Sequence, residues 1–151
     1  MKPTPFLYRR SLYRLLTVLS GLAILIVSSV PNLPQPEMQT SGHVIRLDYF
    51  LHFLVYFFPA FTAVMWLSGR DGCIAHRKFV ILLLAGVLFG CIDEIHQIYI
   101  PGRRFNPIDL IFNAVGFVSG AILTYHWLIR HLLIRKNRFP LMRKNLFGQS
   151  T

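Results

Sequence analysis

Four long apolar segments constrain this chain most strongly. They run over roughly residues 12–30, 49–68, 79–100 and 107–129. Each is close to the about 20 residues that an α-helix needs to cross a hydrocarbon core of about 30 Å. Because lipid offers backbone N–H and C=O groups no hydrogen-bond partner, each spanning segment is expected to be helical. The sequence therefore predicts an all-α polytopic membrane protein, with four transmembrane helices in a small bundle and a single domain over residues 1–151.

The charge pattern predicts the orientation of the helices. The chain has 16 Lys and Arg against 6 Asp and Glu, a formal net charge of +10, although 54% of its residues are hydrophobic. Cytoplasmic flanks of spanning helices are enriched in Lys and Arg. Thirteen basic residues flank one set of helix ends, while Arg46, Arg103 and Arg104 flank the other. We therefore expect a multi-pass protein of the bacterial cytoplasmic membrane, with both termini and a basic tail over residues 130–151 in the cytoplasm.

Several other classes of protein conflict with this composition. Long Leu, Ile and Phe runs are not typical of a basic disordered tail or a nucleic-acid-binding domain, so no nucleic-acid partner is expected. Cys73 and Cys91 are the only cysteines, which excludes a disulfide scaffold. One alternative concerns the first span, whose basic start, apolar run and Ser28-Ser29-Val30 ending resemble a cleavable secretory signal. Its length favours a retained anchor.

Polar side chains recur on one face of each of the last three spans. An ionisable residue at the centre of a membrane helix costs about 2.5–3.5 kcal/mol on insertion scales, so its presence requires a reason. Spacings of three and four residues place side chains on the same helix face. With the predicted orientation, these faces converge near the outer surface and predict an outward-facing polar cleft. Glu94 lies about 100° round the helix from Asp93, close enough to flank the same cleft. The predicted lining residues are Asp48, His52, Tyr56, Asp93, Glu94, Gln97, Asp109 and Asn113.

Glycines continue two of these faces towards the cytoplasmic half. The third span has Gly86 and Gly90, and the fourth has Gly116 and Gly120, in mirrored order. Small residues four apart let helix backbones approach closely, so the pattern predicts tight packing in the inner half of the bundle. Simpler explanations exist for single residues: a lone His or Asn can form an interhelical hydrogen bond, and Asp48 and Asp109 can cap helix N-termini.

The motifs of the last three spans resemble those of the VanZ-like family of bacterial membrane proteins. The family pattern has an Asp, a His four residues on and a later aromatic residue, as at Asp48, His52 and Tyr56. An Asp-Glu-x-x-Gln motif with a Pro-Gly-Arg turn follows, and then an Asp-x-x-x-Asn-x-x-Gly helix start. The residues that match these two motifs are Asp93, Glu94, Gln97, Pro101, Gly102, Arg103, Asp109, Asn113 and Gly116. Tyr49 departs from the pattern, because the family often has Lys there, which weakens any role that needs a cation at this position.

The resemblance implies an accessory protein of the cell envelope. The name-giving member is similar to a factor that raises resistance to the glycopeptide teicoplanin without altering the peptidoglycan precursor. A biochemical activity does not follow from the motifs. We expect binding of a polar or anionic headgroup of a lipid or envelope precursor at the cleft, with Arg103 or Arg104 either pairing with its acidic residues or holding an anion.

The sequence leaves three other functions open. A membrane enzyme could use His52 with Asp93 or Glu94 in acid–base catalysis on a lipid-linked substrate, although binding without catalysis is the primary expectation. Intramembrane carboxylates and His also occur in proton-coupled transporters, and four spans would then require a homo-oligomer. No His-x-x-x-His or Cys-x-x-Cys spacing is present, so no metal site or cofactor is assigned. Oxygen and nitrogen donors for a divalent ion are nevertheless present at Asp48, His52, Asp93, Glu94 and Asp109.

Overall fold

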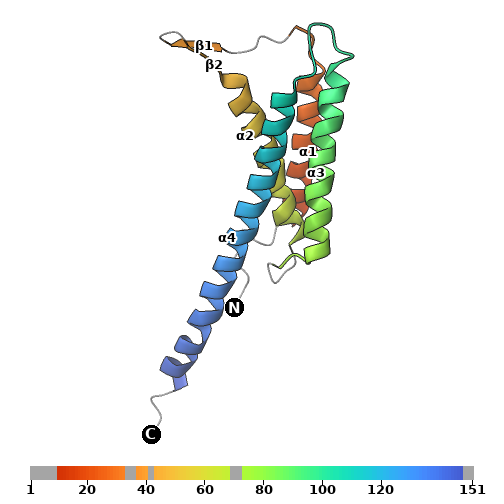
Figure 1. Cartoon of the computed structure of the whole chain (residues 1–151). Helices are drawn as coiled ribbons and strands as arrows, with labels where there is room; N and C mark the ends of the chain where they lie inside the picture. The colour runs from red at the N-terminus through yellow and green to blue at the C-terminus, as the bar shows by residue number, and fades with distance from the viewer. Residues whose placement is uncertain (1–9, 33–36, 41–42, 69–72, 148–151) are drawn as a thin grey trace.

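The computed structural model forms an up-and-down bundle of four helices (Figure 1). It describes residues 10–32, 37–40, 43–68 and 73–147. The helices are α1 (Arg10–Ser28), α2 (Leu47–Leu67), α3 (His76–Gln97) and α4 (Pro107–Phe147), and two short strands, β1 (Glu37–Thr40) and β2 (His43–Arg46), lie between α1 and α2.

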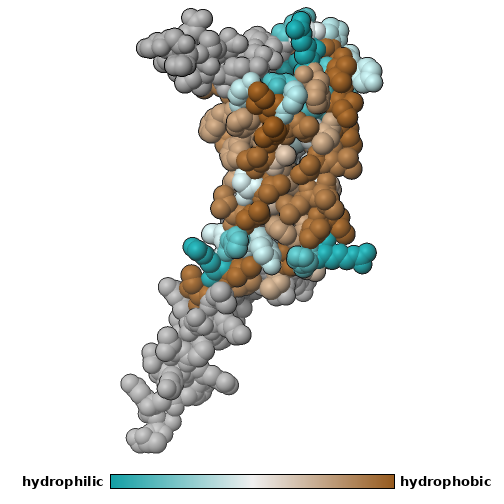
Figure 2. Space-filling model, in the orientation of Figure 1, coloured by the Kyte–Doolittle hydropathy of each residue, from teal (hydrophilic) through white to brown (hydrophobic). Residues whose placement is uncertain are grey.

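All four helices are long and apolar enough to cross a membrane. The qualifying segments are Arg10–Ser28, Leu47–Leu67, His76–Gln97 and Pro107–Leu132. Figure 2 shows hydrophobic residues over the middle of the bundle and hydrophilic residues at both ends of it. Outward-facing side chains such as Ile26 and Leu84, each 67% exposed, form part of this apolar surface. An apolar belt of this kind is stable in lipid rather than in water, so the prediction of an all-α polytopic membrane protein is confirmed.

Helix α2 occupies the centre of the packing, because it contacts both α4 and α1 extensively, while α3 packs mainly on α4. The Thr17 hydroxyl on α1 donates a hydrogen bond to Thr62 Oγ1 on α2 at 3.0 Å. Tyr13 on α1 and Phe61 on α2 meet edge to face, with ring centroids 6.5 Å apart. Helix α1 is therefore packed against α2 at specific contacts.

The glycine faces pack closely, but they do not face each other. A Cβ atom added to Gly116 would collide with the carbonyl oxygen of Phe53, and one added to Gly120 would lie 2.6 Å from the carbonyl oxygen of Phe57. Both contacts are with α2. On α3, the missing side chain of Gly86 is replaced by the ring of Phe117 from α4. The small residues of α4 thus bring its backbone against α2, which explains why these two helices have the largest interface.

The helix boundaries lie within a few residues of the predicted spans, with two differences elsewhere. Helix α4 continues through Phe147, so most of the basic tail expected over residues 130–151 prolongs the helix of the fourth span. The Leu, Arg and Lys residues that follow the span are good helix formers, so nothing in this stretch ends the helix at the membrane boundary. The segment before α2, expected to be a loop, contains an antiparallel hairpin of β1 and β2. In its backbone register, position 37 lies opposite position 46.

Candidate functional site

The structure brings the predicted site residues together at one end of the bundle. The first turns of α2 and α4 and the last turns of α3 lie at this end, beside the connection from α3 to α4. Because α3 runs antiparallel to both α2 and α4, polar residues that begin two helices and end a third reach the same level. The residues brought together there are Asp48, His52, Tyr56, Asp93, Glu94, Gln97, Arg103, Asp109 and Asn113.

A network of buried hydrogen bonds surrounds the side chain of Glu94. Its Oε1 atom accepts from Asn113 Nδ2 at 3.3 Å and from Gln97 Nε2 at 3.4 Å. Its Oε2 atom accepts from the backbone N–H of Asn106 at 3.5 Å. Glu94 and Asn113 are both fully buried. Buried polar groups are costly unless they are hydrogen-bonded, and this network satisfies both carboxylate oxygens of Glu94.

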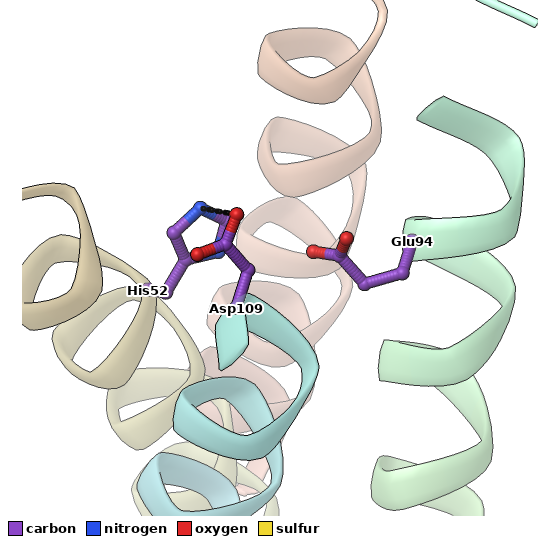
Figure 3. Close-up of side chains that lie close together, drawn as sticks. All are labelled: His52, Glu94 and Asp109. Carbon is purple, nitrogen blue, oxygen red and sulfur yellow. Dashed lines mark ion pairs between the residues drawn. The ribbon is translucent and has the colours of Figure 1, made fainter. Parts of the chain in front are cut away.

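His52 extends the network from α3 and α4 to α2. Its Nδ1 atom is 2.9 Å from Asn113 Oδ1, and its Nε2 atom is 3.8 Å from Asp109 Oδ2. Figure 3 shows Glu94 reaching from α3 towards the adjacent side chains of His52 and Asp109. One ligand atom from each of these three residues lies within 4.8 Å of the other two. The arrangement can hold a proton or a small cation, and it contains a possible acid–base group in His52.

A second contact joins α2 to α3 one turn further into the bundle. The Tyr56 hydroxyl donates a hydrogen bond of 2.9 Å to Asp93 Oδ2. Both side chains are almost fully buried, each with 1% of its surface exposed. The other carboxylate oxygen, Asp93 Oδ1, has no hydrogen-bond partner in the described part of the chain. A buried carboxylate oxygen without a partner is costly, so Asp93 Oδ1 is an acceptor that the described part of the chain leaves unused.

A pocket of about 530 Å³ lies between α1 and the first half of α2. Most of its wall is apolar and comes from α1 and α2. Its polar groups come from α2, the end of α3 and the α3–α4 connection. The apolar lining includes Ala23, Ile24, Val27, Leu51, Leu54, Val55 and Phe58, and the polar lining includes Asp48, His52, Tyr56, Asp93, Gln97 and Arg103. Such a surface suits an amphiphile, with an apolar chain beside α1 and a polar group near the acidic residues.

Arg103 contacts the end of α1. Its Nη2 atom donates to the carbonyl oxygen of Val27 at 3.1 Å, and its Nε atom donates to that of Val30 at 3.4 Å. The last carbonyl groups of a helix lack intrahelical partners and favour a cation. The sequence left open whether Arg103 pairs with an acidic residue or holds an anion. These two bonds go to backbone carbonyl groups and not to an acidic residue. Two bonds leave part of the five-donor guanidinium for a ligand, whereas Arg104 is exposed.

Two polar contacts at this end were missed by reasoning from the sequence. Asn106 caps α4, because its Oδ1 atom accepts the backbone N–H of Ile108 at 3.0 Å, while its own N–H reaches Glu94. The signal was available, since Asn followed by Pro107 is a common helix start. His96 lies 3.0 Å from Ser29 Oγ, which connects α3 to the end of α1. No spacing rule relates these two positions in the sequence.

The comparisons with known proteins are consistent with the motifs. A family model described as VanZ/LLP1 matches residues 7–130 of the 151-residue chain. The matched range includes all four candidate spans up to residue 130 and every residue of the site. Searches of curated proteins and of solved structures found no match.

Proposed function

Because the chain belongs to the VanZ/LLP1 family, we propose that it is an accessory protein of the bacterial cell envelope that binds an amphiphile in its outer pocket. In this proposal the protein lies in the cytoplasmic membrane with the pocket on the outer side, and the ligand is an amphiphile. The single observation that carries it is the pocket of about 530 Å³, in which polar side chains, including that of Asp93, lie next to an apolar groove.

The orientation follows from the basic residues. Arg77 and Lys78 begin α3, and Arg130 and several later basic residues lie in the last part of α4, all at the end opposite the pocket. An excess of Lys and Arg marks the cytoplasmic side. The pocket then opens near the outer surface, where lipid-linked envelope precursors and antibiotics are accessible.

The polar end of the pocket supports a headgroup that contains both an anionic group and hydrogen-bond donors. Arg103 lines the pocket and can hold a phosphate or carboxylate oxygen. Asp93 offers a buried acceptor oxygen for a hydroxyl or ammonium group. The neighbouring wall is apolar, including Ile24 and Leu54, so an acyl or isoprenoid chain can lie there without loss of hydrophobic contact.

Mass spectrometry of co-purifying lipids tests this proposal. The chain is extracted with its native lipids, and the molecules that survive delipidation are identified for the wild type, Arg103→Gln and Arg104→Gln. The expected result is a specific amphiphile retained by the wild type and by Arg104→Gln but depleted in Arg103→Gln. Arg104 is the matched control because it is the neighbouring arginine and does not line the pocket. A lipid composition equal to that of the bulk membrane in all three proteins would contradict the proposal.

A membrane enzyme is the second candidate, and the position of His52 favours it. His52 lines the pocket, lies 3.8 Å from Asp109 and is 21% exposed, so a bound headgroup can reach it. Incubation with labelled lipid-linked substrates separates the two functions. Turnover that is lost in His52→Ala identifies an enzyme, whereas saturable binding without product supports the accessory role.

A link to teicoplanin-type resistance is tested by measuring glycopeptide susceptibility in cells with and without the chain.

A further inference from the structure

Three side chains that can ligate a metal converge from three helices next to the pocket. They are His52 on α2, Glu94 on α3 and Asp109 on α4 (Figure 3), and their ligand atoms lie within 4.8 Å of one another. In protein sites, zinc lies about 2.0–2.2 Å from nitrogen and oxygen ligands, so two ligands of one ion are at most about 4.4 Å apart. The 3.8 Å between His52 Nε2 and Asp109 Oδ2 falls within this limit. Only slight closure is needed for all three atoms to share one ion.

The hydrogen bonds of Asn113 determine which nitrogen of His52 is available. A carboxylate oxygen only accepts hydrogen bonds, so the amide nitrogen of Asn113 points to Glu94 Oε1 and its carbonyl oxygen points to His52. Nδ1 of His52 must then be the protonated nitrogen. In a neutral imidazole, Nε2 carries a lone pair, as in metal-binding histidines whose other nitrogen donates to a neighbouring oxygen.

The distance between His52 and Asp109 distinguishes a cation from a simple hydrogen bond. If Nε2 carried a proton shared with Asp109, a separation of about 2.7–3.0 Å would be expected. At 3.8 Å the two atoms are too far apart for that bond. Two lone pairs that face each other in a buried region repel, and a positive ion between them removes the repulsion.

Burial strengthens the argument for a divalent ion. Glu94 is fully buried, Asp109 is 4% exposed, and in the described residues no Lys or Arg pairs with Glu94. Carboxylates removed from water need compensating charge. A first shell with one imidazole and two carboxylates favours a first-row transition ion such as Zn²⁺ or Mn²⁺ over Ca²⁺ or Mg²⁺, which prefer oxygen ligands.

We propose that His52, Glu94 and Asp109 bind one divalent transition-metal ion, either Zn²⁺ or Mn²⁺. Asn113 orients His52 and Glu94 from behind. Three protein ligands leave a coordination position for water or a ligand atom. His52 also lines the pocket, so this position is within reach of a molecule bound there. Metal binding by these residues does not depend on the amphiphile, and the two proposals can fail separately.

The test uses purified full-length protein in detergent, produced without a polyhistidine tag. After treatment with a chelator, it is dialysed against Zn²⁺ or Mn²⁺, and bound metal is measured by mass spectrometry. We expect one ion per chain, with affinity reduced at least about tenfold in His52→Ala, Asp109→Asn and Asn113→Leu. His96→Gln is the control and should bind metal as the wild type does. His96 lies at the same end, hydrogen-bonded to Ser29, but does not belong to the cluster.

X-ray absorption on the wild type gives a readout that no folding defect can affect. The expected spectrum of the loaded protein shows one imidazole nitrogen and otherwise oxygen ligands. A sulfur ligand from Cys73 or Cys91, a shell of water alone, or no retained metal would overturn the proposal. Wild-type affinity in both His52→Ala and Asp109→Asn would overturn it as well.

Discussion

Tyr56→Phe removes a single oxygen atom from the interior of the bundle and tests whether the polar contacts carry interaction energy. The lost hydroxyl donates to Asp93 Oδ2 at 2.9 Å, and both residues are 1% exposed. The ring packing stays, including the contact with Phe89 at a centroid distance of 6.1 Å. The change therefore isolates the hydrogen bond. It also leaves neither oxygen of Asp93 with a hydrogen-bond partner among the described residues, so the measured loss includes the cost of that unpaired group.

The expected magnitude follows from the burial of this bond. Hydrogen bonds to charged groups contribute about 1.5–3 kcal/mol in soluble proteins. Between membrane helices the mean is about 0.6 kcal/mol and the largest values are about 1.7 kcal/mol, because the unfolded chain in the membrane also finds partners. A short bond between two buried groups belongs near the upper end. We expect Tyr56→Phe to lower the free energy of unfolding by about 1–1.7 kcal/mol.

A double-mutant cycle in mixed detergent and SDS measures this quantity. The unfolding free energy is determined for Tyr56→Phe, Asp93→Ala and the double variant, and the coupling energy is taken from the difference. Tyr99→Phe is the matched control, because Tyr99 lies at the same end but is 78% exposed, and it should be nearly neutral. A coupling energy below about 0.3 kcal/mol, which is within the usual error of additivity, would refute the reasoning.

Two further predictions concern packing and orientation. Gly116→Ala should destabilise the bundle by about 1–3 kcal/mol, because its Cβ would collide with Phe53, whereas Gly21→Ala, with no atom within 4 Å, should be neutral or stabilising in the same unfolding assay. Equal effects would contradict the proposed α2–α4 contact. In intact cells, a membrane-impermeant thiol reagent should label Arg104→Cys but not Cys73, which is exposed at the other end of the bundle. Labelling in the reverse pattern would invert the orientation and place the pocket inside.

Much of the architecture could be predicted because lipid leaves few choices. Apolar length alone predicts helices such as α2 and α3, and one-face spacing correctly grouped Asp48 with His52 and Tyr56. Spacing says nothing about which helices touch, however. The glycines of α4 were expected to match those of α3, yet they contact α2, because Phe117 fills the space at Gly86.

The same limit applies to the site. The sequence identified polar residues at one depth but not their partners, since a partner depends on the rotation of each helix about its axis. Arg103 shows this most clearly: its interactions with Val27 and Val30 require α1 to end beside the α3–α4 connection. The convergence of His52, Glu94 and Asp109 on one point likewise depends on three helices, and no spacing within one helix encodes it.

The central claim is that the outer polar pocket binds an amphiphile. It is tested most directly by titrating the delipidated wild type and Asp93→Asn with the species that the wild type retains from its membrane. Asp93 is chosen because it lines the pocket and its Oδ1 atom has no hydrogen-bond partner among the described residues. The account predicts saturation at one molecule per chain and at least about tenfold weaker binding by the variant, equivalent to about 1.4 kcal/mol. Binding that does not saturate, or equal affinity in the two proteins, would contradict it.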